Sequence, residues 1–88
     1  MSEARKIESE VLAAQKSSEA ADRLIERYLP FIRSEAAKTL GSFPAGGQDG
    51  LSIAMLAFYE CILVYRPGRG AFLHLASVSI RNRLIDFS

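Results

Sequence analysis

The sequence predicts an all-α domain, a compact bundle of four to five helices, and three observations lead to this fold class. Apolar residues recur mostly at spacings of three and four, which is the period of an amphipathic helix. No segment of five or more residues alternates cleanly between apolar and polar side chains, so strand signals are weak. The chain has 88 residues, of which 49% are hydrophobic and 24% are charged, and this composition suits one globular domain.

The first helix is expected to begin after Ser2, whose hydroxyl can accept from the free backbone N–H groups of a helix start. Ile7, Val11 and Leu12 then form a narrow apolar stripe. The serine pair at residues 17–18 interrupts this pattern and offers the next N-cap. We therefore interpret residues 1–17 as an N-terminal helical extension and residues 18–88 as the main domain.

A second amphipathic segment extends from the serine pair to Gly41, where a helix is expected to end. Pro30 lies inside this segment, and its ring removes a backbone donor and crowds the preceding turn. We expect it to kink the helix or to begin a new one near Leu29. The glycines and the proline of residues 41–50 indicate a loop. The apolar face consists of Leu24, Ile25, Tyr28, Leu29, Ile32, Ala36 and Leu40.

The next helix, predicted for residues 50–65 with Asp49 as its N-cap, is apolar on nearly all sides. Such a helix is either central in the fold or docks a second surface, and the sequence leaves both possibilities open. One face carries Leu51, Ala54, Ala57, Phe58, Cys61, Ile62 and Tyr65. The other face carries Ser52, Met55, Leu56, Tyr59 and Leu63.

A proline and two glycines among residues 66–70 predict a turn, and the last helix is expected from near Ala71 to the end of the chain. Because no helix-terminating residues precede Ser88, we expect the chain to be cut within or just after a helix. One side of this helix carries Leu73, Ala76, Ile80, Leu84 and Phe87. Another side carries Leu75, Val78, Ser79, Asn82 and Asp86, with Arg83 beside them.

The formal net charge of +1 conceals an uneven distribution along the chain. Residues 1–60 hold seven basic and nine acidic residues, whereas residues 61–88 hold four arginines and a single acid, Asp86. The C-terminal third is therefore basic and permits nucleic-acid binding. A chance cluster of surface arginines is the plainer explanation, and charge alone does not separate the two.

Several function classes are not expected from this sequence. Cys61 is the single cysteine, which excludes an internal disulfide and a cysteine-based zinc cluster, so we expect no metal and a reducing cytoplasm as the compartment. Cys61 and His74 are expected to be a buried thiol and a surface imidazole rather than a catalytic pair. No phosphate-binding glycine motif, secretory signal or membrane span is present, so we expect no cofactor, no small-molecule substrate and no membrane contact.

Three stretches together resemble region 2 of the sigma-70 family of bacterial RNA polymerase sigma factors, namely residues 49–65, residues 66–72 and residues 76–86. Residues 24–32 are similar to the opening helix of that domain, so the resemblance covers residues 18–88. The Ser52-Ile53 pair and residues 56–58 look most like the sigma-I subfamily of spore-forming bacteria. The expected fold is therefore the helical bundle of sigma region 2.

The resemblance implies that the helix opened by Asp49 docks on the clamp helices of the polymerase β′ subunit, and that an anti-sigma factor is a second partner. Ser52 and Ile53 stand where the family usually carries polar or acidic contacts, which favours an apolar dock. The docking residues expected on this basis are Asp49, Ser52, Ile53, Met55, Leu56, Tyr59 and Leu63.

The resemblance further implies that the last helix recognises promoter DNA at the −10 element, with Asn82 at a base-contacting position and nearby arginines on phosphates. Val78 and Ser79 replace a tryptophan pair that props the duplex open in housekeeping members, so the loop before this helix is expected to hold an extruded base. The alternative is a protein-interaction module of sigma shape that is bound by an anti-sigma factor and recognises no DNA. The DNA-binding residues expected are Arg66, Arg69, Gly70, Leu75, Val78, Ser79, Arg81, Asn82 and Arg83.

Overall fold

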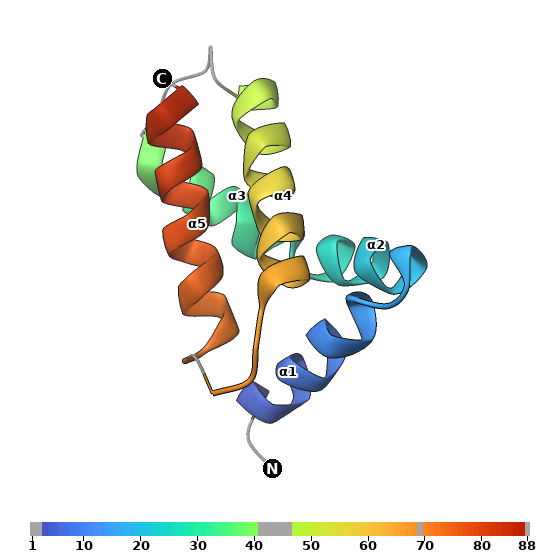
Figure 1. Cartoon of the computed structure of the whole chain (residues 1–88). Coiled ribbons are helices and arrows are strands. Elements are labelled where there is room, and N and C mark those ends of the chain that lie inside the picture. Colours follow the sequence, from blue (N-terminus) through green and yellow to red (C-terminus); the bar gives the residue numbers. More distant parts are fainter. Residues whose placement is uncertain (1–2, 41–46, 69, 88) are drawn as a thin grey trace.

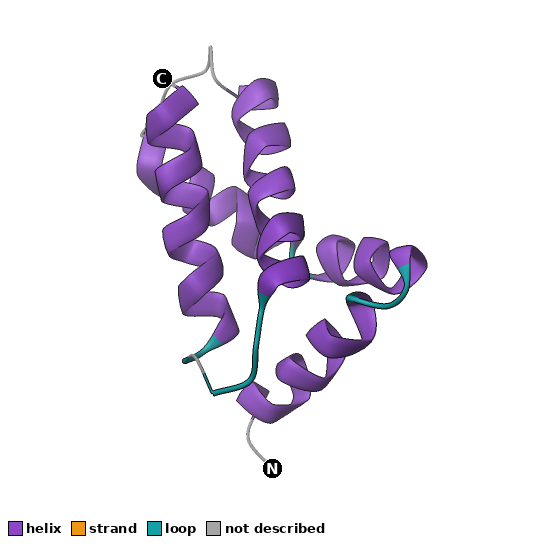
Figure 2. Cartoon of the chain, in the orientation of Figure 1, coloured by secondary structure: helices purple, strands orange, loops and turns teal. Residues whose placement is uncertain are grey.

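The computed structural model describes residues 3–40, 47–68 and 70–87, and over these residues it contains five helices and no strand (Figure 2). This confirms the predicted all-α bundle. The Cα radius of gyration is 12.8 Å, close to the value of about 12 Å expected for a compact chain of this length. The helices are α1 (Glu3–Ala14), α2 (Ser18–Arg27), α3 (Leu29–Leu40), α4 (Gly47–Val64) and α5 (Phe72–Phe87).

The last two helices form the centre of the arrangement (Figure 1). α4 and α5 lie side by side and run in opposite directions, and α3 packs against both of them. α1 and α2 form a second pair, which packs beside the C-terminal half of α4. Arg27 of α2 forms an ion pair with Glu10 of α1 within this pair. The end of α4 and the loop that follows it therefore lie close to α1.

One hydrophobic core joins all five helices. The ring of Phe58 on α4 is fully buried and lies against Tyr28, with ring centroids 6.1 Å apart, and edge-on against Phe72 of α5, with centroids 5.4 Å apart. α1 contributes Ile7, Val11 and Ala14 to the same core. The helix expected as an extension is therefore packed into the domain through Ile7 and Val11 of its predicted stripe, whereas Leu12 is half-buried.

Two of the predicted helix boundaries are confirmed. Ser17 is the N-cap of α2, and its hydroxyl accepts a 3.3 Å hydrogen bond from the backbone N–H of Ala20. α3 begins at Leu29, so Pro30 lies in the first turn, where a missing backbone N–H breaks no intrahelical bond.

The predicted start of the fourth helix is wrong. α4 begins at Gly47, so Asp49 lies inside the first helical turn and is not the N-cap. The first four N–H groups of a helix have no intrahelical acceptor, and residues that weaken a helix interior are therefore tolerated in this turn. The predicted end of this helix and the predicted start of the next one each differ from the structure by one residue. α4 ends at Val64 and α5 begins at Phe72. The expected cap Ser2 and most of the glycine-rich loop, residues 41–46, lie outside the described residues.

Candidate functional site

α4 has one buried face and one exposed face, as its sequence pattern predicted. Ala54, Phe58 and Ile62 are fully buried, whereas Leu56 and Leu63 are 49% and 47% exposed. The second apolar stripe therefore lies at the surface and is not part of the core. The remaining members of the expected docking set are exposed at Ser52 and half-buried at Ile53, Met55 and Tyr59. Asp49 lies in the first turn of α4, and its side chain is outside the described part.

α5 carries the expected DNA-facing residues on one side. At about 100° per residue, Leu75, Val78, Ser79 and Asn82 fall within one sector of the helix surface. Val78 and Asn82 are exposed, and Leu75 and Ser79 are half-buried. We call these four residues the Asn82 face. The opposite sector is fully buried at Ala76, Ile80 and Leu84, which anchors the helix in the core.

The two arginines of α5 lie on opposite flanks of the Asn82 face, and each is close to an acid of another helix. Arg83 forms an ion pair with Glu60 of α4, and both side chains are partly exposed. Arg81 is exposed, and its charge contributes to lowering the pKa of Glu35 on α3. Both arginines are therefore accessible, and a phosphate would have to compete with Glu60 for Arg83.

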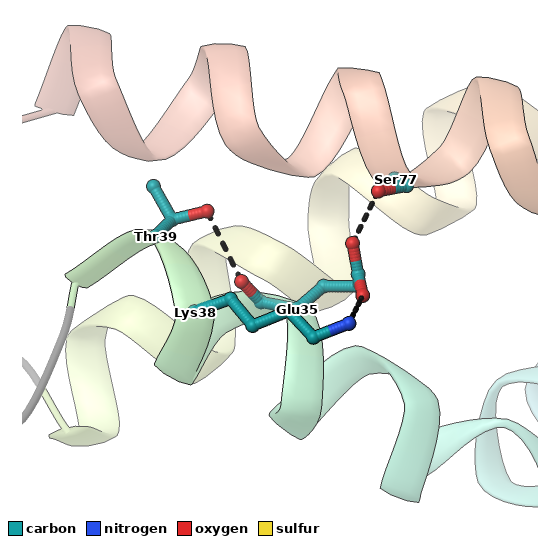
Figure 3. A network of polar contacts seen from close by, with 4 residues as sticks. All are labelled: Glu35, Lys38, Thr39 and Ser77. Carbon is teal, nitrogen blue, oxygen red and sulfur yellow. Dashed lines mark hydrogen bonds and ion pairs between the residues drawn. The ribbon is translucent and has the colours of Figure 1, made fainter.

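Glu35 is the centre of a polar network between α3 and α5 (Figure 3). The Ser77 hydroxyl of α5 donates to one carboxylate oxygen of Glu35, and the Lys38 Nζ lies 3.1 Å from the other. The hydroxyl of Thr39 donates to the backbone carbonyl of Glu35 at 3.1 Å. The Ser77 hydrogen bond is the main cause that holds the pKa of Glu35 below its ordinary value, against the effect of burial, and Lys38 and Arg81 add to it. This network fixes how α5 is turned against α3.

Glu35 and Ser77, which join α3 to α5, were not among the residues predicted from the sequence. Neither residue belongs to a recognisable motif, and 42 positions separate them in the chain. The sequence signal at Ser77 is a hydroxyl between the apolar residues Ala76 and Val78, and it does not indicate a partner.

A shallow depression lies between α4 and α5, beside the Arg83–Glu60 ion pair. The depression is lined by Glu60, Cys61, Leu63, Val64 and Ser79. Its lining includes Leu63 of the predicted docking surface on α4 and Ser79 of the Asn82 face on α5, so these two surfaces adjoin along a seam.

Cys61 and His74 are a buried thiol and a surface imidazole, as expected. Burial raises the pKa of the Cys61 thiol, so this group stays protonated at neutral pH. His74 is exposed on α5.

The loop between α4 and α5 depends on two glycines with positive φ. Gly68 and Gly70 have φ angles of 92° and 103°, which side chains with a Cβ rarely adopt. No atom lies within 4 Å of the position that a Cβ would take at Gly70, so backbone conformation and not space calls for glycine there. Arg66 is exposed, as is Gly70, whereas Arg69 lies outside the described residues.

Two curated proteins are similar to this chain over nearly its whole length. The RNA polymerase sigma factor SigI7 of Acetivibrio thermocellus is 38% identical over 82 residues, and the RNA polymerase sigma factor SigI of Bacillus subtilis is 30% identical over 83 residues. Each alignment covers 92% of this chain. The chain is a sigma-I-like sigma factor domain. It spans 35% and 33% of the length of these two relatives. No family model and no solved structure matches it.

The sigma-I-like domain thus brings most of its expected site residues to adjoining surfaces of α4 and α5. The exposed second apolar stripe of α4 lies on one side of the seam at Glu60 and Arg83, and the Asn82 face of α5 lies on the other side. Within residues 3–40, 47–68 and 70–87, no group of three histidine, cysteine or acidic side chains could hold a metal ion. No helix in this part of the domain is long and apolar enough to cross a bilayer.

Proposed function

We propose that this sigma-I-like domain has the two tasks of a promoter-specificity subunit of RNA polymerase. The outer face of α4 docks on the clamp helices of the polymerase β′ subunit. α5 and the loop before it recognise and open the promoter −10 element. The observation that carries this proposal is the exposed Asn82, which lies between two accessible arginines on the opposite flanks of its face of α5. The domain supplies binding and not catalysis.

The chemistry of the α5 surface supports a duplex-binding role. Arginine guanidinium groups bind phosphates whatever the base sequence, and they set the register of a protein on DNA. An asparagine amide can make a bidentate pair with an adenine edge in the major groove. Arg81 and Arg83 supply the first kind of contact on the two flanks, and Asn82 supplies the second kind between them.

The chemistry of the α4 surface supports a protein partner. Leu56 and Leu63 lie about two helical turns apart and each exposes nearly half of its surface, so they form an apolar strip on the outer side of the helix. The half-buried Met55 and Tyr59 extend this strip. Aromatic residues and methionine are enriched in protein interfaces. An anti-sigma factor would compete with the β′ clamp for the same strip.

The test is selection of promoter sequences from a random duplex library, with and without core RNA polymerase. We expect enrichment of one −10-like sequence only when both the chain and the core enzyme are present. Binding should weaken linearly on a log–log plot of affinity against salt, with a slope of about −0.9 for each phosphate contact. If the chain binds core polymerase or an anti-sigma factor but enriches no DNA sequence, the protein-interaction module is the correct function.

A further inference from the structure

The end of α4 is capped by a side chain that comes from the other end of the sequence. Gln15 directly follows α1, and its Nε2 donates to the backbone carbonyls of Ile62 and Tyr65 at 2.9 Å and 2.7 Å. A side-chain amide carries two N–H groups, so both hydrogen bonds form at once. The last carbonyls of a helix lack the usual donor four residues further on, and the Ile62 carbonyl also accepts a long, 3.4 Å hydrogen bond from the backbone N–H of Tyr65. Gln15 therefore supplies the C-cap of α4 across 47 and 50 residues of sequence.

Tyr65, the residue at which the chain leaves α4, is also held through its ring and its hydroxyl. The ring is 4% exposed and packs edge-on against Phe72, with centroids 5.4 Å apart. The hydroxyl lies 2.9 Å from a carboxylate oxygen of Glu8 on α1 and 3.3 Å from the backbone carbonyl of Gly70. It carries one proton, and the nearer, charged acceptor is Glu8. Burial and the neighbouring carboxylate raise the pKa of Tyr65, so the hydroxyl remains a donor at neutral pH.

These contacts fix Tyr65, the first residue of the loop between α4 and α5. Residues 66–68 and 70–71 of this loop are exposed and include Gly68 and Gly70, and glycine has more backbone freedom than other residues. The direction in which the chain leaves Tyr65 therefore decides where the loop stands relative to α5. α1 and the residue after it set that direction from outside the α4–α5 pair.

We propose that Gln15 and Glu8 are positioning residues for promoter opening, because through Tyr65 they hold the α4–α5 loop in the shape that receives unpaired DNA. This inference rests on the proposed function of the domain. Unstacked bases need a preformed site, since unstacking costs a few kcal/mol per base. Phosphates can still be held by the arginines of α5 when the loop is loose. Loss of either positioning contact therefore reduces opening more than duplex affinity.

The main test variant is Gln15→Glu, which keeps the size of the side chain and replaces both donors with acceptors. Gln15→Arg is the rescue variant, because the guanidinium restores N–H donors toward the two carbonyls. Ser18→Glu is the matched control, since it adds the same charge at a nearby exposed position in the first turn of α2, where an acid is favourable. Tyr65→Phe keeps the buried ring and removes the hydroxyl, so it tests the Glu8 contact separately.

Loop order is measured by NMR relaxation of the Gly68 and Gly70 amides in the chain alone. Opening is measured by permanganate reactivity of −10 thymines, and duplex affinity by gel shift, with the chain and core polymerase on a promoter selected by the wild type. For Gln15→Glu and Tyr65→Phe we expect order parameters to fall from about 0.85 toward 0.6. We expect opening to fall by roughly five- to tenfold, the worth of one or two hydrogen bonds. Affinity should change by less than about twofold, and Gln15→Arg should restore opening.

Three results would overturn the inference. The first is a looser loop with normal promoter opening. The second is an equal fall in promoter opening and duplex affinity. The third is an effect of Ser18→Glu equal to that of Gln15→Glu. Failure of the proposed function looks different, because the wild-type chain would then select no promoter with core polymerase. If Gln15→Glu or Tyr65→Phe does not fold, its helical circular dichroism is lost. The other of these two variants then tests the inference.

Discussion

At the scale of single residues, base recognition and phosphate binding by α5 are proposed for different side chains. Asn82 is exposed on its own sector of the helix and has donors and an acceptor for a base edge. The arginines beside it have charge and reach but little base preference when they bind phosphates. Sequence specificity should therefore depend on Asn82, and general affinity should depend on the arginines.

Asn82→Ala should relax the preference at one position of the −10 element, at a cost of about 1–3 kcal/mol for the preferred base. The measurement is competition between the selected promoter and its single-base variants in a footprinting assay. Arg81→Ala is the comparison variant, since it should weaken binding to all sequences and reduce the salt slope by about one contact. Unchanged ratios between promoter variants for Asn82→Ala would remove this residue as a base contact.

If Arg83 binds a phosphate as proposed, Glu60 competes with DNA for it. Glu60→Gln leaves the guanidinium of Arg83 without its acid and should raise affinity for all DNA sequences by roughly two- to fivefold, in line with the about 0.2–1 kcal/mol of an exposed ion pair. Glu19→Gln is the matched control, because Glu19 also forms an exposed ion pair with an arginine, Arg23, and both of these residues lie on α2. An equal gain in both variants would mean that net charge alone, and not release of Arg83, sets the affinity.

At the scale of helices, α4 has one face in the core and one at the surface, and the proposed function gives the surface face a protein partner. Leu56→Glu and Leu63→Glu should each weaken binding to the β′ clamp or to an anti-sigma factor by tenfold or more while helicity is kept, because about half of each side chain is already in water. Ile62→Glu is the contrasting variant, since a charge at a fully buried site should unfold the domain. If the two outer variants also unfold, the strip belongs to the core and the docking proposal fails.

The α3–α5 contact at Glu35 should make stability depend on pH. The pKa of Glu35 is lowered in the folded state, so its ionised form stabilises the fold above the unfolded pKa of about 4.5, and this stabilisation is lost as pH falls further. The melting-temperature difference between wild type and Glu35→Ala should therefore shrink on acidification from pH 6 to pH 3. Glu19→Ala, with an exposed partner, controls for general charge effects. A difference that stays constant over this range would contradict the assignment.

The sequence predicted helix boundaries correctly where the interaction that sets them lies within a few residues. Ser17 and Pro30 set the boundaries of α2 and α3, because capping and the missing proline N–H act within a few residues. The start of α4 was missed, since Gly47 is a weak helix former and the helix extends through it. The two faces of α4 followed directly from the period of the helix.

At the scale of the whole molecule, the contacts that hold the site together could not be predicted. Gln15 with Tyr65, and Ser77 with Glu35, join positions 50 and 42 residues apart, and no periodicity encodes such pairs. Gln15 and Glu8 lie in residues 1–17, which the sequence predicted to be an N-terminal extension, and no pattern there pointed to their contacts with Tyr65. In the folded domain α1 belongs to the core, and its Glu8 accepts a hydrogen bond from Tyr65, the first residue of the loop before α5.

The central claim is that adjoining surfaces of α4 and α5 hold polymerase and promoter at the same time. The most direct measurement is photo-crosslinking of the chain, core polymerase and a selected promoter, with a photoreactive side chain at position 56 or at position 82. Position 22 on α2, which is exposed, is the control. We predict crosslinks from position 56 to the β′ subunit, from position 82 to DNA within the −10 element, and to neither from position 22. Crosslinks from position 82 to protein alone would contradict the account.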